Sequence, residues 1–174
     1  MEITFYLAAA VAVASTVLVI TRLNAVHALL YLIVSLLAVA LMFLTLGAPF
    51  AAALEIILYA GAIMVLFVFV IMMLNLGPQT VGQERAWLQP RMWAGPAALA
   101  AVLAAEFVWV FASGAASLGL GQAAVPPKQV GLTLYGPYLL GVEMASYLLL
   151  AGLVGAFHLG RRARRPDSTG GQNP

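Results

Sequence analysis

Long, nearly uninterrupted apolar stretches alternate with short polar segments along the chain. Five of these stretches reach the length of roughly 20 residues that a helix needs to cross a bilayer. Helices are favoured over strands because the stretches are continuous and because backbone groups in lipid must be paired within their own segment. The pattern predicts an all-α, polytopic membrane protein with five transmembrane helices at residues 3–21, 27–46, 50–75, 93–113 and 134–159.

The five helices are expected to form a single transmembrane domain over residues 1–165. A flexible cytoplasmic tail with Gly, Ser and Pro is expected at 166–174. Only a short turn around Pro49 separates the second and third helices, which predicts that they are antiparallel neighbours. The two longer connections, 77–92 and 114–133, contain prolines and charged residues and are expected to be loops.

The composition excludes most kinds of active site. Of the 174 residues, 64% are hydrophobic and 8% are charged, whereas soluble domains carry about 25% charged residues. The absence of cysteine excludes disulfides, thiolate catalysis and cysteine-ligated clusters. The two histidines, His27 and His158, are far apart, and no nucleotide-binding glycine loop is present. We therefore expect no catalytic, cofactor-binding or metal-binding residues in this chain.

The basic residues predict the orientation in the membrane. Seven of the eight would lie on one side of the membrane, namely Arg22, Arg85, Arg91, Arg161, Arg162, Arg164 and Arg165. Lys128 would lie alone on the other side. Because loops rich in Lys and Arg stay in the cytoplasm, the N-terminus is expected outside and the C-terminus inside. A basic run can suggest nucleic-acid binding, but beside a helix end it more often sets topology, so no nucleic-acid partner is expected.

Three carboxylates fall within the predicted spans: Glu55, Glu106 and Glu143. A charged side chain at the centre of a spanning helix costs about 2.5–3.5 kcal/mol on insertion scales, so each should face protein or water. All three are candidates for a proton path. The alternative is an interhelical hydrogen bond that holds the packing together, and this reading is favoured for Glu106 and Glu143. No Lys or Arg lies within the spans, so a partner charge would have to come from another chain.

The third span contains the most distinctive local pattern. Spacing of i, i+4 and i+7 would place Glu55, Tyr59 and Ala62 on one face of an α-helix. A tyrosine hydroxyl at this depth needs a partner or water. The small residues Ala60, Gly61 and Ala62 make a thin stretch where a π-bulge or kink is easily accommodated. Close packing against a neighbouring helix explains these small residues equally well.

Residues 55–75 resemble the third helix of the J-type membrane subunit of proton-pumping NADH:quinone oxidoreductase, respiratory complex I. Residues 24–29, at the entry to the second helix, and residues 84–88, in the loop after the third, also fit that family. The Tyr-Ala-Gly-Ala-Ile-Met-Val-Leu-Phe run that begins at Tyr59 is the specific part of the match. The second half of the chain matches only as two further helices in suitable places.

The resemblance implies a multi-pass subunit in the bacterial inner membrane, within a complex that oxidises NADH, reduces quinone and pumps protons, or sodium in related systems. FMN, iron–sulfur clusters and quinone would then be bound by partner subunits and not by this chain. The implied partners are the quinone-site subunit, small three-helix subunits and antiporter-like subunits.

The resemblance also implies a mechanism. The family's third helix carries a π-bulge near the positions of Tyr59 and Gly61, and interconversion of π and α forms is proposed to open and close a water path. Tyr59, Ala60, Gly61 and Ala62 are therefore the helix-switch candidates. Glu55 and Tyr59 are the path candidates that the resemblance supports.

Two other functions remain open from the residues alone. A subunit of a multisubunit cation/proton antiporter would also have few charges and several spans, but it would not be expected to share the whole run from 59 to 75. The other is a purely structural membrane scaffold with no moving part. A solitary enzyme is disfavoured because no nucleophile–base pair or metal site is visible in the sequence.

Overall fold

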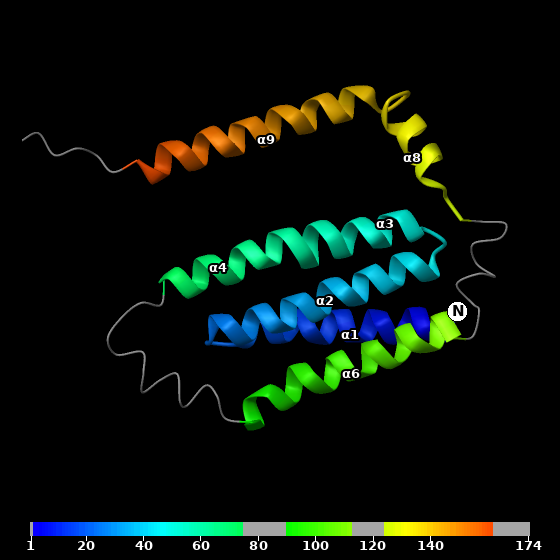
Figure 1. Ribbon diagram of the computed structural model, residues 1–174, viewed down its shortest axis with the longest axis vertical. Coiled ribbons are helices and arrows are strands. Elements are labelled where there is room, and N and C mark those ends of the chain that lie inside the picture. Colours follow the sequence, from blue (N-terminus) through cyan, green and yellow to red (C-terminus); the bar gives the residue numbers. More distant parts are fainter. Residues whose placement is uncertain (1, 75–89, 113–123, 162–174) are drawn as a thin grey trace, which may run out of the picture. The chain divides into compact units, whose positions relative to one another are not determined.

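The computed structural model describes residues 2–74, 90–112 and 124–161, and every regular element among them is a helix (Figure 1). Five stretches of these residues are helical, long and apolar enough to cross a membrane, which confirms the predicted all-α class and number of spans. The elements are α1 (Glu2–Thr21), α2 (Ala25–Thr45), α3 (Pro49–Leu54), η1 (Glu55–Ile63), α4 (Met64–Leu74), α6 (Pro90–Ala112), α8 (Pro127–Leu134) and α9 (Leu139–Gly160). Helices α3, η1 and α4 follow one another without interruption and make up the third span.

Contacts divide the chain into two compact units, Met1–Pro127 and Lys128–Pro174. The first contains α1 to α6, and the second contains α9 and all of α8 after its first residue. The single domain expected over 1–165 stays a prediction. The tail expected at 166–174 lies outside the described residues.

The predicted start of the fifth span at residue 134 is wrong, because α9 begins at Leu139. Part of the expected loop before it is the separate helix α8, which begins at Pro127. Proline suits the first position of a helix because its missing N–H would be unpaired there in any case. The two helices are separated by a tight turn at Gly136, where a Cβ would lie only 2.7 Å from the carbonyl oxygen of Leu132. The same proline rule places the start of α6 at Pro90, three residues before the predicted span.

Helices α1 and α2 form an antiparallel pair. Asn24, in the short connection between them, caps the start of α2. The Asn24 side chain accepts hydrogen bonds from the backbone N–H groups of Val26 (2.9 Å) and His27 (3.4 Å). These bonds satisfy two of the donors that a helix start leaves unpaired. Further along the pair, the hydroxyl groups of Thr16 and Ser35 hydrogen-bond to each other at 2.9 Å. The two helices are therefore joined by polar contacts as well as by packing.

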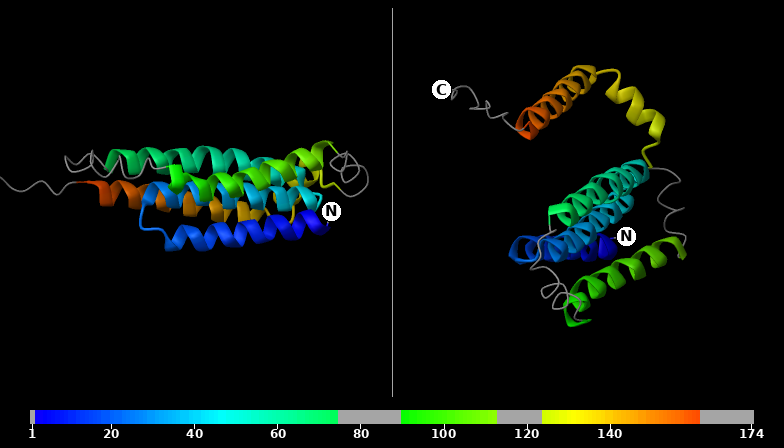
Figure 2. Two further views of the ribbon diagram at one scale, coloured as in Figure 1. Left: turned by 90° about the horizontal axis from the view of Figure 1, so that it is seen from below. Right: turned by 60° about the vertical axis from the view of Figure 1, so that its left-hand side comes forward.

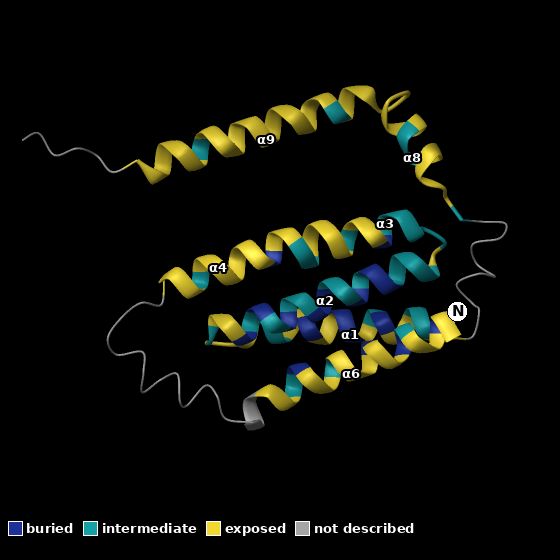
Figure 3. Ribbon diagram, in the orientation of Figure 1, coloured by how far each residue is buried: buried dark blue, intermediate teal, exposed yellow. Residues whose placement is uncertain are grey.

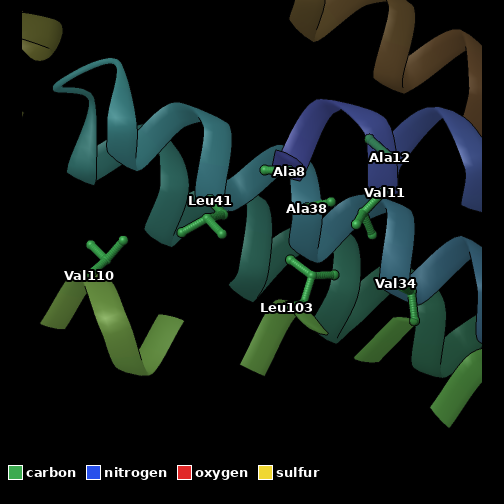
Figure 4. Packing of buried hydrophobic residues seen from close by; sticks show 8 residues of the cluster. All are labelled: Ala8, Val11, Ala12, Val34, Ala38, Leu41, Leu103 and Val110. Atoms are coloured by element: carbon green, nitrogen blue, oxygen red, sulfur yellow. The ribbon is translucent and has the colours of Figure 1, made fainter. Parts of the chain in front are cut away.

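A hydrophobic cluster joins α6 to this pair (Figure 4). Its buried members are Ala8, Val11, Ala12, Val34, Ala38, Leu41, Leu103 and Val110. In lipid there is little hydrophobic drive between helices, so small side chains that let backbones approach closely carry much of the packing. The alanines of α1 and α2 serve this purpose, and Leu103 and Val110 of α6 pack against them.

The turn from α2 into α3 reverses the chain. Gly47 has φ 77°, in the left-handed region, which is favourable for glycine at the end of a helix. The N–H of Gly47 bonds to the carbonyl of Leu44 at 3.2 Å, and the N–H of Ala48 to that of Phe43 at 2.9 Å. As expected, the third span then runs back beside α2 (Figures 1 and 2).

Burial differs sharply among the spans (Figure 3). The facing sides of α1, α2 and α6 contain nearly all of the buried side chains among the described residues. In contrast, α4 is buried only at Met64, and no residue of α9 is buried. Helices α4 and α9 thus present apolar side chains that the described part of the chain leaves exposed.

Candidate functional site: a π-helical segment in the third span

The nine residues from Glu55 to Ile63 form a π-helix in the middle of the third span. At its end, the N–H of Met64 reaches the carbonyl of Tyr59, five residues earlier, as well as that of Gly61. π-Helices are rare and occur mostly as single-turn bulges inside α-helices, frequently at functional sites. The four helix-switch candidates named from the sequence all lie in this segment.

At Gly61 the π-helix leaves little room for a side chain. A Cβ built on Gly61 would lie 3.2 Å from the carbonyl oxygen of Ile56. That oxygen belongs to the residue five positions earlier, which is the hydrogen-bonding distance along the chain in a π-helix. A side chain at residue 61 would therefore press against the backbone of the π form.

The two polar side chains of the segment are only partly covered by the described residues of the first unit. Glu55 is half-buried at the first position of η1, and Tyr59 is 50% exposed. The expected common face of Glu55, Tyr59 and Ala62 assumed 3.6 residues per turn. Because the turns of the π-helix are wider, Ala62 is no longer in line with Glu55 and Tyr59.

Met64 fixes the position of the helix after the π segment. Only 2% of its surface is exposed, whereas Val65 and Leu66, which follow it, are exposed. Both η1 and α4 contact α2. A change in hydrogen-bond register within η1 would turn α4 and would have to draw Met64 out of this contact.

The structure does not gather the three carboxylates into one group. Glu106 is buried on the face of α6 that packs against α1 and α2, whereas Glu55 is on the third span. Glu143 is exposed in the second unit. It lies four residues into α9, about 6 Å along the helix axis, and not the nine residues expected from the sequence.

A cluster of aromatic residues near the starts of α2 and α6 was not predicted from the sequence. The rings of His27 and Trp93 meet edge to face, with centroids 6.2 Å apart, and His27 is 4% exposed. Beside them the hydroxyl of Tyr31 lies against the backbone of Gly95. The guanidinium of Arg22 lies 5.5 Å above the Tyr31 ring, within range of a cation–π interaction. A signal was present, since the spacing of His27 and Tyr31 places both on one face of α2.

Among residues 2–74, 90–112 and 124–161, no three His, Asp or Glu side chains are arranged to hold a metal ion. The segment around Tyr59 contains a carboxyl group and a phenol. Its backbone has two possible hydrogen-bond registers.

Five helices that are long and apolar enough to cross a membrane, with a π-helical segment in the third, define a polytopic membrane protein. The sequence matches the family described as NADH-ubiquinone/plastoquinone oxidoreductase chain 6 over residues 15–159. The chain belongs to this family.

Relatives cover almost the whole chain. NADH-quinone oxidoreductase subunit J of Pseudomonas aeruginosa is 64% identical over 162 residues, which are 93% of this chain and 98% of the relative. Subunit J of Escherichia coli K12 is 56% identical over 164 residues, 94% of this chain and 89% of the relative. Subunit J of Buchnera aphidicola subsp. Schizaphis graminum is 47% identical over 164 residues, 94% of this chain and 100% of the relative. These relatives extend the resemblance beyond the first half of the chain.

Proposed function

We propose that this chain is a membrane-arm subunit of NADH:quinone oxidoreductase and that it couples quinone reduction to proton translocation through a register switch in its third span. The family match and the names of the relatives support the first part. The observation that carries the second part is the π-helix at Glu55–Ile63. The redox chemistry itself belongs to partner subunits that hold FMN, iron–sulfur clusters and quinone.

The switch works by changing the hydrogen-bond register of η1 by one residue. Conversion of η1 from i→i+5 to i→i+4 bonding turns the helix that follows it by about 100°, the angle of one residue in an α-helix. Met64 then leaves its place against α2, and the exposed face of α4 turns with it. Glu55 and Tyr59 precede, in the sequence, the helix that turns. There, water and a sister subunit can complete or interrupt a chain of proton carriers.

The surroundings of the chain follow from the same proposal. The N-terminus lies outside the bacterial inner membrane and the C-terminus in the cytoplasm, because the basic residues cluster on one side. Exposed apolar faces on α4 and α9 meet lipid and sister subunits. The partners are the quinone-site subunit, the small three-helix subunits and the antiporter-like subunits.

The proposal is tested by removing the two polar groups of η1 one at a time. Tyr59→Phe and Glu55→Gln keep the size of each side chain and remove its ability to carry a proton. Proton uptake per NADH oxidised is measured in inverted membrane vesicles, with NADH oxidation by an artificial acceptor as the measure of assembly. We expect each variant to assemble normally and to pump fewer protons per NADH.

Tyr147→Phe is the matched control, since Tyr147 is an exposed tyrosine on α9. It should pump as the unaltered complex does. Normal pumping by both Tyr59→Phe and Glu55→Gln would contradict a role of η1 in the proton path. A simpler check concerns the assembly: purification through this chain should bring down a large flavin-containing complex with NADH dehydrogenase activity. Recovery of a stable, solitary chain would instead favour a scaffold or an antiporter component.

A further inference from the structure

Glu106 is a carboxylic acid enclosed by its own chain. Its side chain is 7% exposed, and neither carboxyl oxygen has a hydrogen-bond partner or appreciable accessible surface within the described part of the structure. It lies three residues after Leu103 and four before Val110, so all three share one face of α6. This is the face that packs against α1 and α2 (Figure 4).

The groups around this face are apolar. The parts of α1 and α2 that form the cluster with Leu103 and Val110 contribute alanine, valine, leucine and methionine side chains to it. Among the polar groups of α1 and α2, the hydroxyls of Thr16 and Ser35 lie 2.9 Å apart and each is within hydrogen-bonding distance of the carbonyl of Ala12. The buried hydroxyl of Ser15 has no hydrogen-bond partner within the described part of the structure. No Lys or Arg lies within α1, α2 or the 93–112 part of α6 to balance a negative charge.

Sister subunits cannot change this situation while the bundle stays closed. The carboxyl oxygens are covered by residues of this chain, so a group from another subunit reaches them only if α6 moves away from α1 and α2. An unpaired carboxylate in such a place is far less stable than the protonated acid, because nothing replaces the water that it lost.

We propose that Glu106 is an occluded proton-binding site. As the bundle closes, the carboxylate takes up one proton from water and becomes a neutral carboxylic acid, with no other bond made or broken. The proton is released only when α6 separates from α1 and α2. This site is distinct from the π segment of the third span, and its test does not depend on the register switch.

Infrared spectra of the intact complex test this assignment directly. A protonated carboxylic acid has a C=O stretching band that a carboxylate lacks. In the difference between the unaltered complex and Glu106→Gln we expect the loss of one such band. After transfer to D2O this band should shift at least several-fold more slowly than the amide bands of exposed loops. Glu2→Gln, which alters an exposed carboxylate at the first residue of α1, should remove no slowly exchanging band.

Each alternative result would overturn the assignment. If the Glu106→Gln difference contains only carboxylate bands, the residue is charged; if its C=O band shifts at once in D2O, the residue is not occluded. Assembly gives a second readout, because a neutral replacement should be tolerated. Glu106→Gln and the apolar Glu106→Leu are both expected to give amounts of assembled complex close to the unaltered level. Failure of both variants to assemble would show that the negative charge itself is needed and would contradict the proposal.

Discussion

The α1–α2–α6 bundle and the third span solve the problem of polar groups in a membrane in opposite ways. In the bundle, Thr16 and Ser35 pair with each other, and Glu106 is enclosed by apolar side chains. In the third span, Glu55 is half-buried and Tyr59 is exposed, and both lie in the π-helical segment. These polar groups of the bundle are covered by its own side chains, whereas those of the third span remain accessible in the described structure. Function is therefore expected where the polar groups are accessible.

The largest effect is expected from Gly61→Val. The first atom of the new side chain would lie 3.2 Å from the Ile56 carbonyl, and overpacking of this kind costs about 1–3 kcal/mol. Such a cost shifts the balance between π and α forms by roughly fivefold or more. We expect most of the NADH-driven pumping to be lost while assembly is kept.

The matched control for Gly61→Val is Gly152→Val on α9. There an added Cβ meets no atom within 4 Å. Its proton-to-NADH ratio should stay at the unaltered value. Equal ratios in Gly61→Val and in the unaltered complex would remove the difference that we draw between the third span and the rest of the chain.

Chemical labelling sharpens the comparison at Met64. The chain has no cysteine, so Met64→Cys introduces a single site whose modification can be followed by mass spectrometry of this subunit. With 2% of the Met64 side chain exposed, labelling should be slow in the resting complex and several-fold faster during NADH turnover. Equal rates in both conditions would count against a turning α4. Leu41→Cys, in the closed bundle, should label slowly in both.

Within the bundle, Gly95→Ala tests the close approach of α6 to α2. The added carbon would overlap the Tyr31 hydroxyl, so we expect a loss of stability of about 1–3 kcal/mol, seen as a lower thermal midpoint of the assembled complex. The pair Gly95→Ala and Tyr31→Phe should recover part of that loss, because the overlapping oxygen is gone. A double variant no more stable than the single one would contradict the contact.

The smallest effect is expected from Ser35→Ala. Its hydroxyl bonds to Thr16 at 2.9 Å and to the Ala12 carbonyl at 3.3 Å, and interhelical hydrogen bonds in membranes average about 0.6 kcal/mol. The thermal midpoint should fall slightly. Ser146→Ala, whose hydroxyl bonds only within α9 to Val142 at 3.1 Å, should show a still smaller change. A larger loss from Ser146→Ala would contradict the importance of the α1–α2 contact.

Some of this structure could be predicted from the sequence because it depends on local properties. The five spans follow from the length of the apolar stretches, and the small residues at 60–62 indicated where the backbone could depart from an α-helix. The predictions that failed depended on geometry that hydropathy does not contain. Once η1 is a π-helix, the spacing of Glu55, Tyr59 and Ala62 no longer describes one face. The short helix α8 was missed because its eight residues are too few and too polar to be recognised as a span.

Which of the carboxylates is buried could also be learned only from the tertiary structure. Glu106 and Glu143 are alike in sequence, each lying in a long apolar stretch. Only the packing of α6 against α1 and α2 makes the first buried, while the second remains exposed on α9. The contact of His27 with Trp93 likewise joins residues that are far apart in the chain, so its two partners were visible in the sequence but their meeting was not.

The most direct test of the account is a pair of high-resolution structures of the intact complex, one at rest and one trapped during NADH-driven quinone reduction. The account predicts that the N–H of Met64 bonds to the carbonyl of Tyr59 in one state and to that of Ala60 in the other, with ordered water near Glu55 and Tyr59 in only one of them. The same π register and the same water positions in both states would contradict it.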